Sequence, residues 1–163
     1  MGKDIHMYIC EKGKVVKSDI FNGRCSCWFD NMSEKGEYDE YNHLPIVYGW
    51  NEGTVPKKLK NEYPKEDGYF DFYHVKVGYF KEWFKKYRPD IDAGWATKYE
   101  AWAIEHKGYR PGYLPKELDE NANINDNIFV EYERCDDCSK WLYNYLNDNK
   151  IKDNAFIVYC FDC

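Results

Sequence analysis

An alternating apolar stretch at residues 5–10 constrains the fold of this chain more than any other feature. Apolar residues that alternate with a period of two indicate a β-strand. Residues 11–14, Glu-Lys-Gly-Lys, are a predicted turn, and residues 15–20 can return as a partner strand. Residues 21–23, Phe-Asn-Gly, are expected to break that pattern. The sequence therefore predicts an N-terminal hairpin on which a sheet can be built.

The C-terminal part of the chain carries a second clear pattern. Residues 128–132 predict a strand, residues 139–146 a helix and residues 156–161 another strand. A strand–helix–strand unit usually places its two strands parallel and adjacent, with a right-handed crossover. We therefore expect a C-terminal βαβ unit whose strands join the N-terminal hairpin.

Two stretches in the middle of the chain predict helices, because aromatic residues recur three or four positions apart. The first covers residues 79–87 and is expected to end at Arg88-Pro89-Asp90. The second covers residues 93–106, with Trp95, Tyr99 and Trp102 on one face. The remaining segments predict shorter elements: a short helix or ordered loop (24–32), an exposed loop (33–42), an extended stretch (43–48) and a surface loop with room for one helical turn (51–68).

Length and composition fit one folded domain over residues 1–163. The chain is 44% hydrophobic and 19% aromatic, which is enough apolar material for a core. No internal repeat and no linker interrupts it. The predicted fold class is α/β or α+β, with a small mixed sheet made from the N-terminal hairpin and the C-terminal βαβ unit. The central aromatic helices are expected to pack on that sheet.

The net charge of −6 and the pI of about 5.3 limit the classes of partner. A protein that binds polymeric nucleic acid needs a basic surface, and no block of Lys or Arg runs along this chain. No apolar run is long enough to span a bilayer, and the N-terminus lacks the apolar core of a signal peptide. We therefore expect a soluble, cytoplasmic protein with reduced cysteines. A small anionic ligand stays compatible with this charge, because a few local cations can hold it.

Polar residues at the ends of the predicted strands form a candidate ligand site. Asp4 and His6 lie two apart, so both side chains point to the same face of the first strand. Asp162 ends the last strand and comes close to them only if the two strands run antiparallel. The full set of candidate ligand-binding residues is Asp4, His6, Arg24, Trp28, Tyr73, His74 and Asp162. The structural alternative is a turn cap at Asp4, a hydrogen-bonded polar residue at His6 and a surface ion pair at Arg24.

Each chemical role in this set follows from the residue type. Arg24 provides a planar fork for a phosphate or carboxylate, and Trp28 or Tyr73 provides a ring on which a base can stack. His6 and His74 can position a ligand or transfer a proton. His43 and His106 are more simply explained as structural residues.

The order of several short motifs resembles a family of small proteins encoded by phages and prophages. These proteins open with Met-Gly-x-Asp-Ile-His and end in an apolar strand that closes on aromatic-Asp. The corresponding motifs here are Asp4-Ile5-His6, Arg24 with Trp28-Phe29, Leu44-Pro45, Tyr73-His74 before Tyr79-Phe80, and residues 157–162. The family has no settled activity. The resemblance therefore implies a phage accessory protein, and such proteins often counter host defence.

That resemblance suggests three functions. The leading expectation is an anti-defence protein that binds and sequesters a small anionic, nucleotide-type signal in the cytoplasm of an infected bacterium, without catalysis. A homo-oligomer is expected, because sequestering proteins often bind at subunit interfaces. The first alternative is a hydrolase that cleaves such a nucleotide with His6 and His74 as acid and base. A metallophosphoesterase is not expected, because its further motifs Gly-Asp and Gly-Asn-His are absent from the sequence. The second alternative is an inhibitor that binds a host protein through aromatic and acidic surface.

Two Cys-x-x-Cys pairs near the C-terminus predict a structural zinc site. Four thiolates at this spacing are typical of tetrahedral zinc, and a βαβ unit would bring both pairs to one edge of the sheet. The expected ligands are Cys135, Cys138, Cys160 and Cys163. The aspartates between them add negative charge that disfavours a four-thiolate site. Buried thiols or a disulfide are the alternative interpretations.

Overall fold

The structure is a computed structural model that describes residues 4–23, 47–48, 54–63, 72–134 and 138–162 of the 163-residue chain. It divides into two compact units, the first made of Met1–Tyr87 with Cys138–Cys163 and the second of Arg88–Asp137. The second unit is therefore an insertion between two elements of the first. The single domain expected over residues 1–163 is subdivided in this way, and each unit is described by itself.

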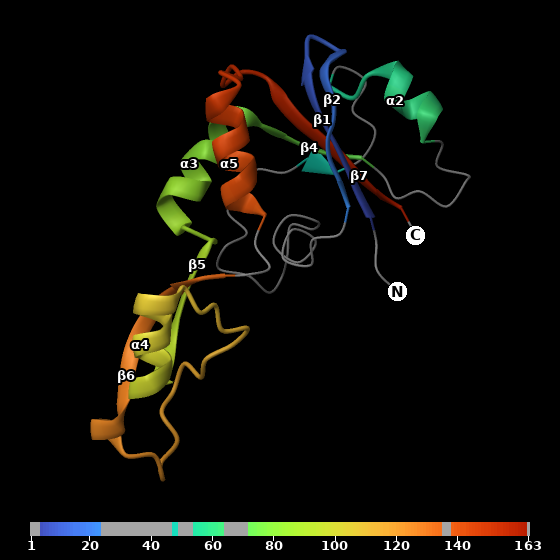
Figure 1. Cartoon of the computed structure of the whole chain (residues 1–163). Helices are drawn as coiled ribbons and strands as arrows, with labels where there is room; N and C mark the ends of the chain where they lie inside the picture. Colours follow the sequence, from blue (N-terminus) through green and yellow to red (C-terminus); the bar gives the residue numbers. More distant parts are fainter. Residues whose placement is uncertain (1–3, 24–46, 49–53, 64–71, 135–137, 163) are drawn as a thin grey trace. The chain divides into compact units, whose positions relative to one another are not determined.

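The first unit is built on a five-stranded sheet in the order β2-β1-β7-β4-β3 (Figure 1). Its strands are β1 (Asp4–Glu11), β2 (Lys14–Gly23), β3 (Val47–Tyr48), β4 (Tyr73–Lys76) and β7 (Phe156–Asp162). Every pair of neighbours is antiparallel. The predicted hairpin is confirmed. The expected break at residues 21–23 is wrong, because Phe21 and Gly23 still pair with β1.

The two ends of the chain meet at the centre of this sheet. β1 and β7 pair along their whole length, from Asp4 opposite Asp162 to Cys10 opposite Phe156. Asp4 and His6 were expected to approach the end of the last strand only if the two strands were antiparallel. The backbone pairing of β1 with β7 is antiparallel, so it meets this condition. Residues 156–161 of β7 are apolar on both faces, which is typical of a strand covered on each side, whereas β1 carries Asp4 and His6 on the same face as Tyr8 and Cys10.

Helices cover both faces of the sheet. α3 (Val77–Tyr87) and α5 (Ser139–Asp148) pack on one face, where Phe84 stacks on Tyr143 with ring centroids 4.5 Å apart. α2 (Lys57–Glu62) covers the opposite face, where Leu59 is buried. The predicted helix at residues 79–87 is confirmed. The loop expected at 51–68 contains a helix, because Val55, Leu59 and Tyr63 supply an apolar stripe four residues apart.

The second unit is a two-stranded antiparallel sheet with one helix. Its elements are β5 (Ile91–Thr97), α4 (Lys98–Lys107), a short 3₁₀ helix η2 (Ile124–Asp126) and β6 (Asn127–Glu133). β5 and β6 pair without a register shift, from Ile91 opposite Glu133 to Thr97 opposite Asn127. A small cluster of Ala96, Leu114 and Tyr132, with Val130 and Ile104 against it, forms the core under α4.

The helix expected over residues 93–106 is wrong in its first part, because residues 91–97 form β5. The helix begins only at Lys98, where Thr97 caps it. The Glu100 backbone N–H donates to the Thr97 hydroxyl, and the Thr97 backbone N–H donates to the Glu100 carboxylate. This reciprocal capping box fixes the start of α4. Within β5, Leu114 packs so closely on Gly94 that a Cβ there would lie 2.6 Å from the Leu114 Cβ, so this position requires glycine.

The expected βαβ unit is also wrong. The helix and both strands exist, but β6 pairs with β5 in the second unit and β7 lies between β1 and β4 in the first. The two strands are therefore not neighbours. Of the two predicted classes, α/β or α+β, the structure confirms α+β. The expected mixed sheet is wrong, because all strand pairs of the described residues are antiparallel. The expectations for residues 24–42, for residues 43–46 of the predicted extended stretch and for residues 51–53 and 64–68 of the predicted surface loop lie outside the described residues.

Candidate functional site

The two candidate histidines lie on the same face of the sheet, the one that α2 covers. His6 in β1 is paired with Cys160 of β7, and His74 in β4 is paired with Val158 of the same strand. Two strand spacings and two residues along the strand separate their Cα atoms by about 12 Å. The fold therefore brings them to one face but not into contact, and a direct acid–base pair between them is not formed.

Tyr63, at the end of α2, connects His6 to the rest of this face. Its ring lies 5.1 Å from the His6 ring, and its hydroxyl lies 2.6 Å from the buried hydroxyl of Tyr8. Burial, helped by this hydrogen bond, raises the pKa of Tyr8 far above its usual range. Burial also raises the pKa of Tyr63 to about 12, against the lowering effect of its bond to Tyr8. Both phenols are therefore protonated at neutral pH and act as neutral hydrogen-bonding groups.

His74 is buried more deeply, with 3% of its surface exposed. Neither ring nitrogen has a hydrogen-bond partner among the described residues, and Phe156 packs edge-on against the ring at 5.6 Å. Burial lowers the pKa of His74 below its ordinary value, because the charged imidazolium loses its hydration. At neutral pH this side chain is an uncharged imidazole, which cannot neutralise a phosphate.

Tyr73 lies on the other face of the sheet, although it is adjacent to His74 in sequence. Successive residues of a strand point to opposite faces. Tyr73 stacks on Tyr159 at 5.4 Å and packs edge-on against Phe161 at 5.6 Å, inside the core under α3 and α5. It is therefore not available to stack on a ligand beside His6. Arg24, Trp28 and the side chain of Asp162 lie outside the described residues.

The described cysteines of the predicted zinc site occupy opposite faces of the sheet. Cys160 is fully buried with Tyr8 and Leu59 on the α2 face, whereas Cys138 packs against the core on the α5 face. Cys160 is a free thiol, and Cys138 is disulfide-bonded, in contrast to the reduced state expected for it. No group of three potential metal ligands occurs among the described residues. Cys135 and Cys163 lie outside them, so the four-cysteine zinc site stays a prediction.

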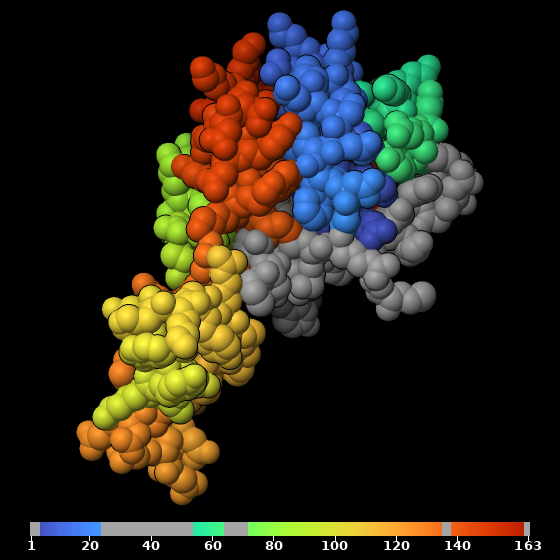
Figure 2. All heavy atoms as spheres, viewed as in Figure 1, coloured from blue at the N-terminus to red at the C-terminus, as the bar shows by residue number. Residues whose placement is uncertain are grey.

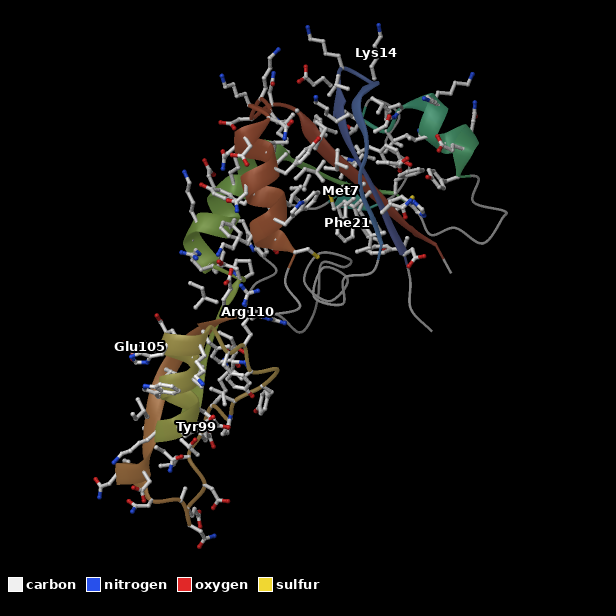
Figure 3. The ribbon with its side chains drawn as sticks, in the orientation of Figure 1. Met7, Lys14, Phe21, Tyr99, Glu105 and Arg110 are labelled. Carbon is white, nitrogen blue, oxygen red and sulfur yellow. The ribbon has the colours of Figure 1, made fainter. Side chains whose placement is uncertain are left out.

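The α5 face of the first unit carries a shallow apolar recess. Met7 and Phe21 of the hairpin line it with three residues at the start of α5, Cys138, Trp141 and Leu142 (Figure 3). The recess is open to solvent and leaves no enclosed room for a drug-sized ligand. It has no polar lining and so does not suit a nucleotide.

The second unit differs from the first in charge. Residues 88–137 contain 12 of the 29 acidic residues and 6 of the 23 basic residues of the chain. The entire net charge of −6 therefore belongs to the second unit, and the first unit is neutral. An acidic surface of this kind attracts cationic partners and repels nucleic acid.

The second unit also exposes most of the large apolar side chains that reach the surface. Seven of the ten that are exposed among the described residues belong to it: Tyr99, Trp102, Tyr109, Tyr113, Ile124, Ile128 and Phe129. α4 and the connection that follows it form the face of this unit seen in Figure 2. Exposed apolar patches on a folded unit usually mark contact surfaces.

On α4, aromatic rings form a stripe along the exposed side of the helix. Tyr99 and Trp102 stack with centroids 6.3 Å apart, and Trp102 stacks on His106 at 5.1 Å. The Lys107 ammonium lies 5.3 Å from the Trp102 ring centre. Tyr99 and Glu105 extend from different sides of the helix (Figure 3). The sequence had indicated these rings as a packing face, whereas Tyr99 is 73% exposed.

The face of the β5–β6 sheet opposite α4 carries a second aromatic pair. Trp95 and Phe129 are cross-strand neighbours and meet edge to face at 5.4 Å. The next pair along the same face is Ala93 with the exposed Glu131. The sheet therefore presents aromatic surface beside a carboxylate, a combination that suits a partner with Lys or Arg side chains.

A polar network holds the chain segment after α4 against β5. The Lys116 ammonium pairs with the Asp92 carboxylate, and the Tyr132 hydroxyl donates to Asp92 at 3.3 Å. Burial alone would raise the pKa of Asp92, but the Lys116 hydrogen bond holds it below its ordinary value. The Trp95 backbone N–H donates to the Pro115 carbonyl at 2.8 Å. The outer edge of β5 is therefore covered.

Sequence reasoning missed the second unit as a surface, and one signal could have found part of it. Thr97-x-x-Glu100 is the sequence signature of a capping box, and it places the start of a helix at Lys98 rather than at Ala93. With that boundary, Trp95 falls on a strand and no longer shares a helix face with Tyr99. The exposure of the aromatic rings has no such signal, because it depends on which elements pack together.

Comparisons with known protein families, with curated proteins and with solved structures found no match to this chain. Among the described residues, no helix is both long and apolar enough to cross a membrane.

Proposed function

We propose that this protein is a non-catalytic protein-binding module whose second unit contacts a basic surface of another protein. The single observation that carries the proposal is the coincidence, in residues 88–137, of all the net negative charge with most of the large apolar side chains that are exposed among the described residues. Under the resemblance to phage proteins, the partner is a factor of the bacterial host.

The chemistry of the surface supports binding rather than catalysis. Tyr and Trp supply much of the binding energy at protein interfaces, because their large rigid rings lose little conformational entropy. The surrounding carboxylates speed association with a cationic partner and select against acidic ones. The polar network at Asp92 fixes the surface, because it holds the chain segment at Lys116 on β5. A preformed surface loses less entropy on binding.

Affinity purification with matched surface variants tests this proposal. Trp102→Ser and Phe129→Ser remove exposed rings of the second unit, and Tyr79→Ser removes a comparably exposed ring of the first unit. We expect a partner that the wild type and Tyr79→Ser retain, and that binds Trp102→Ser or Phe129→Ser about tenfold or more weakly when purified. Equal retention by all three variants, or an acidic partner, would contradict the proposal.

A second candidate is the binding of a small ligand on the α2 face of the first unit. The observation that favours it is His74, whose two buried ring nitrogens have no hydrogen-bond partner in the part of the chain that the structure describes. A buried polar group without a partner is uncommon and calls for an explanation. This candidate retains the expected nucleotide signal as ligand. It ranks second because His74 is uncharged at neutral pH, so it can contribute hydrogen bonds but no charge.

Calorimetric titration with cyclic mono- and dinucleotides tests the second candidate. Binding that is lost in His74→Leu, while far-UV circular dichroism and thermal stability stay unchanged, would support it. His106→Gln is the control, because that histidine lies on α4 in the other unit. Incubation of the bound nucleotide with the protein separates sequestration from hydrolysis, since only a hydrolase yields product.

A further inference from the structure

The hydrogen-bond pattern of the β5–β6 sheet determines which backbone groups of β6 face outward. In an antiparallel pair, residues alternate between those that exchange hydrogen bonds with the opposite residue and those that do not. The Trp95 N–H donates to Pro115, away from β6, and the Arg134 N–H donates to Asp90 across the pair. The pairs Trp95–Phe129 and Ala93–Glu131 are therefore the non-bonded ones. The N–H and C=O groups of Phe129 and Glu131 consequently point to the outer edge of β6.

This outer edge is open among the described residues. The sheet ends at β6, whereas the edge of β5 is covered by the chain at Pro115. Among the described residues, no backbone hydrogen bond outside the β5–β6 pair reaches Phe129 or Glu131, and both residues are exposed. Edge strands are usually protected by charged side chains, lysine above all, by proline or by a β-bulge. The charged side chains of β6, Glu131 and Glu133, are both acidic, so they oppose an acidic strand rather than a basic one. β6, with the sequence Asn-Ile-Phe-Val-Glu-Tyr-Glu, contains no lysine or proline and pairs without a bulge.

We propose that the outer edge of β6 is a strand-addition site for an extended segment of a partner protein that carries an apolar residue and a basic residue two positions apart. This inference rests on the proposed function and specifies its mode of binding. The backbone of the segment pairs with the outward groups of Phe129 and Glu131. On the open face, an apolar side chain of the segment packs beside Phe129 and Trp95, and a Lys or Arg lies opposite Glu131.

Charge favours a basic partner over a second copy of this chain. Pairing of two β6 strands would bring together two units that each carry a net charge of −6. In a symmetric register centred on Glu131, the two carboxylates would also lie directly opposite each other, which is destabilising. A basic segment is instead attracted by the negative electrostatic field of the second unit.

Synthetic peptides provide a direct test on the full chain. The probe is a peptide of the repeat Val-Thr-Lys-Thr, in which Val and Lys lie two apart and share one face, and its matched control replaces every Lys with Glu. Fluorescence anisotropy measures the dissociation constant, and hydrogen exchange measures protection of the Phe129 and Glu131 amides. We expect binding of the Lys peptide, weaker binding at higher salt, protection of both amides and no binding of the Glu peptide.

Two substitutions at one position separate the backbone from the charge. Glu131→Pro removes both the carboxylate and the outward N–H, and an edge strand tolerates proline at such a position. Glu131→Gln removes only the charge. We expect Glu131→Pro to bind the Lys peptide about tenfold more weakly than Glu131→Gln, the effect of losing one or two hydrogen bonds. Tyr79→Lys, at an exposed apolar residue of the first unit, is the control for general surface effects.

The outcomes distinguish this inference from the proposed function. Equal affinity of Glu131→Pro and Glu131→Gln, with protection on α4 instead of β6, would overturn strand addition and leave the protein-binding function standing. Failure of the wild type to bind the Lys peptide would overturn strand addition, and failure also to retain a basic protein partner would overturn the function. Equal binding of the Glu peptide would overturn the assigned class of partner. Self-association of the wild type that protects Phe129 and Glu131 would assign the edge to a second copy and would also overturn that class.

Discussion

At the scale of single residues, His74 is the most unusual group in the first unit. It occupies a strand position where an apolar side chain would fit, between Val47 and Val158 on the neighbouring strands. Its ring makes an aromatic contact with Phe156 and no hydrogen bond to any residue that the structure describes. The cost of burying such a group appears as a pKa below the ordinary value of 6.5.

This shift predicts a pH-dependent stability. In the unfolded chain His74 takes up a proton as the pH falls below about 6.5, whereas the folded chain resists it, so the free energy of unfolding decreases. The decrease is at most about 1.4 kcal/mol per pH unit for one group. Urea denaturation at about pH 7.5 and about pH 5.5 measures it. We expect His74→Leu to lose this part of the pH dependence and His106→Gln to retain it. The same pH dependence in wild type and His74→Leu would show that other groups cause it.

The hydroxyl pair of Tyr8 and Tyr63 predicts a measurable coupling. Tyr63→Phe leaves the buried Tyr8 hydroxyl without its 2.6 Å partner, which costs about 1–2 kcal/mol of unfolding free energy. Adding Tyr8→Phe removes the orphaned hydroxyl and recovers part of that loss. A double-mutant cycle by urea denaturation gives the coupling directly. Additive effects of the two substitutions would show that the hydrogen bond contributes nothing to stability.

At the scale of elements, the start of α4 depends on one short motif. Thr97→Ala removes the hydroxyl that accepts from the Glu100 N–H and is expected to cost about 1 kcal/mol. Because α4 covers a cluster of only a few buried side chains, the loss falls mainly on the second unit. Hydrogen exchange of the Ala103 and Ile104 amides measures it. Thr97→Ser, which keeps the hydroxyl, should exchange as the wild type does. Faster exchange in both variants would assign the effect to packing.

Local patterns predicted most of the elements and failed where tertiary contacts decided. The hairpin, the helix at Val77–Tyr87 and the strand Phe156–Asp162 follow from apolar periodicity. Trp95 lies four residues before Tyr99, a spacing that predicts a helix, although residues 93–97 belong to the strand β5. The close approach of Gly94 to Leu114 favours the strand, and no pattern within that segment reveals it.

At the scale of the whole molecule, the second unit behaves as an insertion. It leaves the first unit after Tyr87 and returns at Cys138, between two helices that pack against each other. Replacement of residues 88–137 by a short Gly-Ser linker is therefore expected to leave the five-stranded sheet folded. Far-UV circular dichroism and thermal unfolding check this. The shortened protein should also lose its net charge and elute earlier from an anion exchanger. Its collapse would show that the second unit is required for folding.

The candidate surface was less predictable than the fold class. Strand periodicity places Asp4 and His6 on one face from sequence alone, and it also places Tyr73 and His74 on opposite faces. The antiparallel pairing of β1 with β7 was only one of two alternatives, because nothing in either strand specifies its distant partner. The concentration of net charge in residues 88–137 is visible in the sequence, but only after the unit boundaries are known.

The position of β7 between β1 and β4 sets the order in which this protein can fold on the ribosome. β1 is synthesised about 150 residues before its central partner, an interval of roughly 8–30 s at typical elongation rates. The second unit has its strands much closer in sequence, so it can fold while the first sheet still lacks its middle. During that interval the unpaired edge of the hairpin is exposed to other chains. Binding by a chaperone at this stage is expected to affect yield more than substitutions in the finished core.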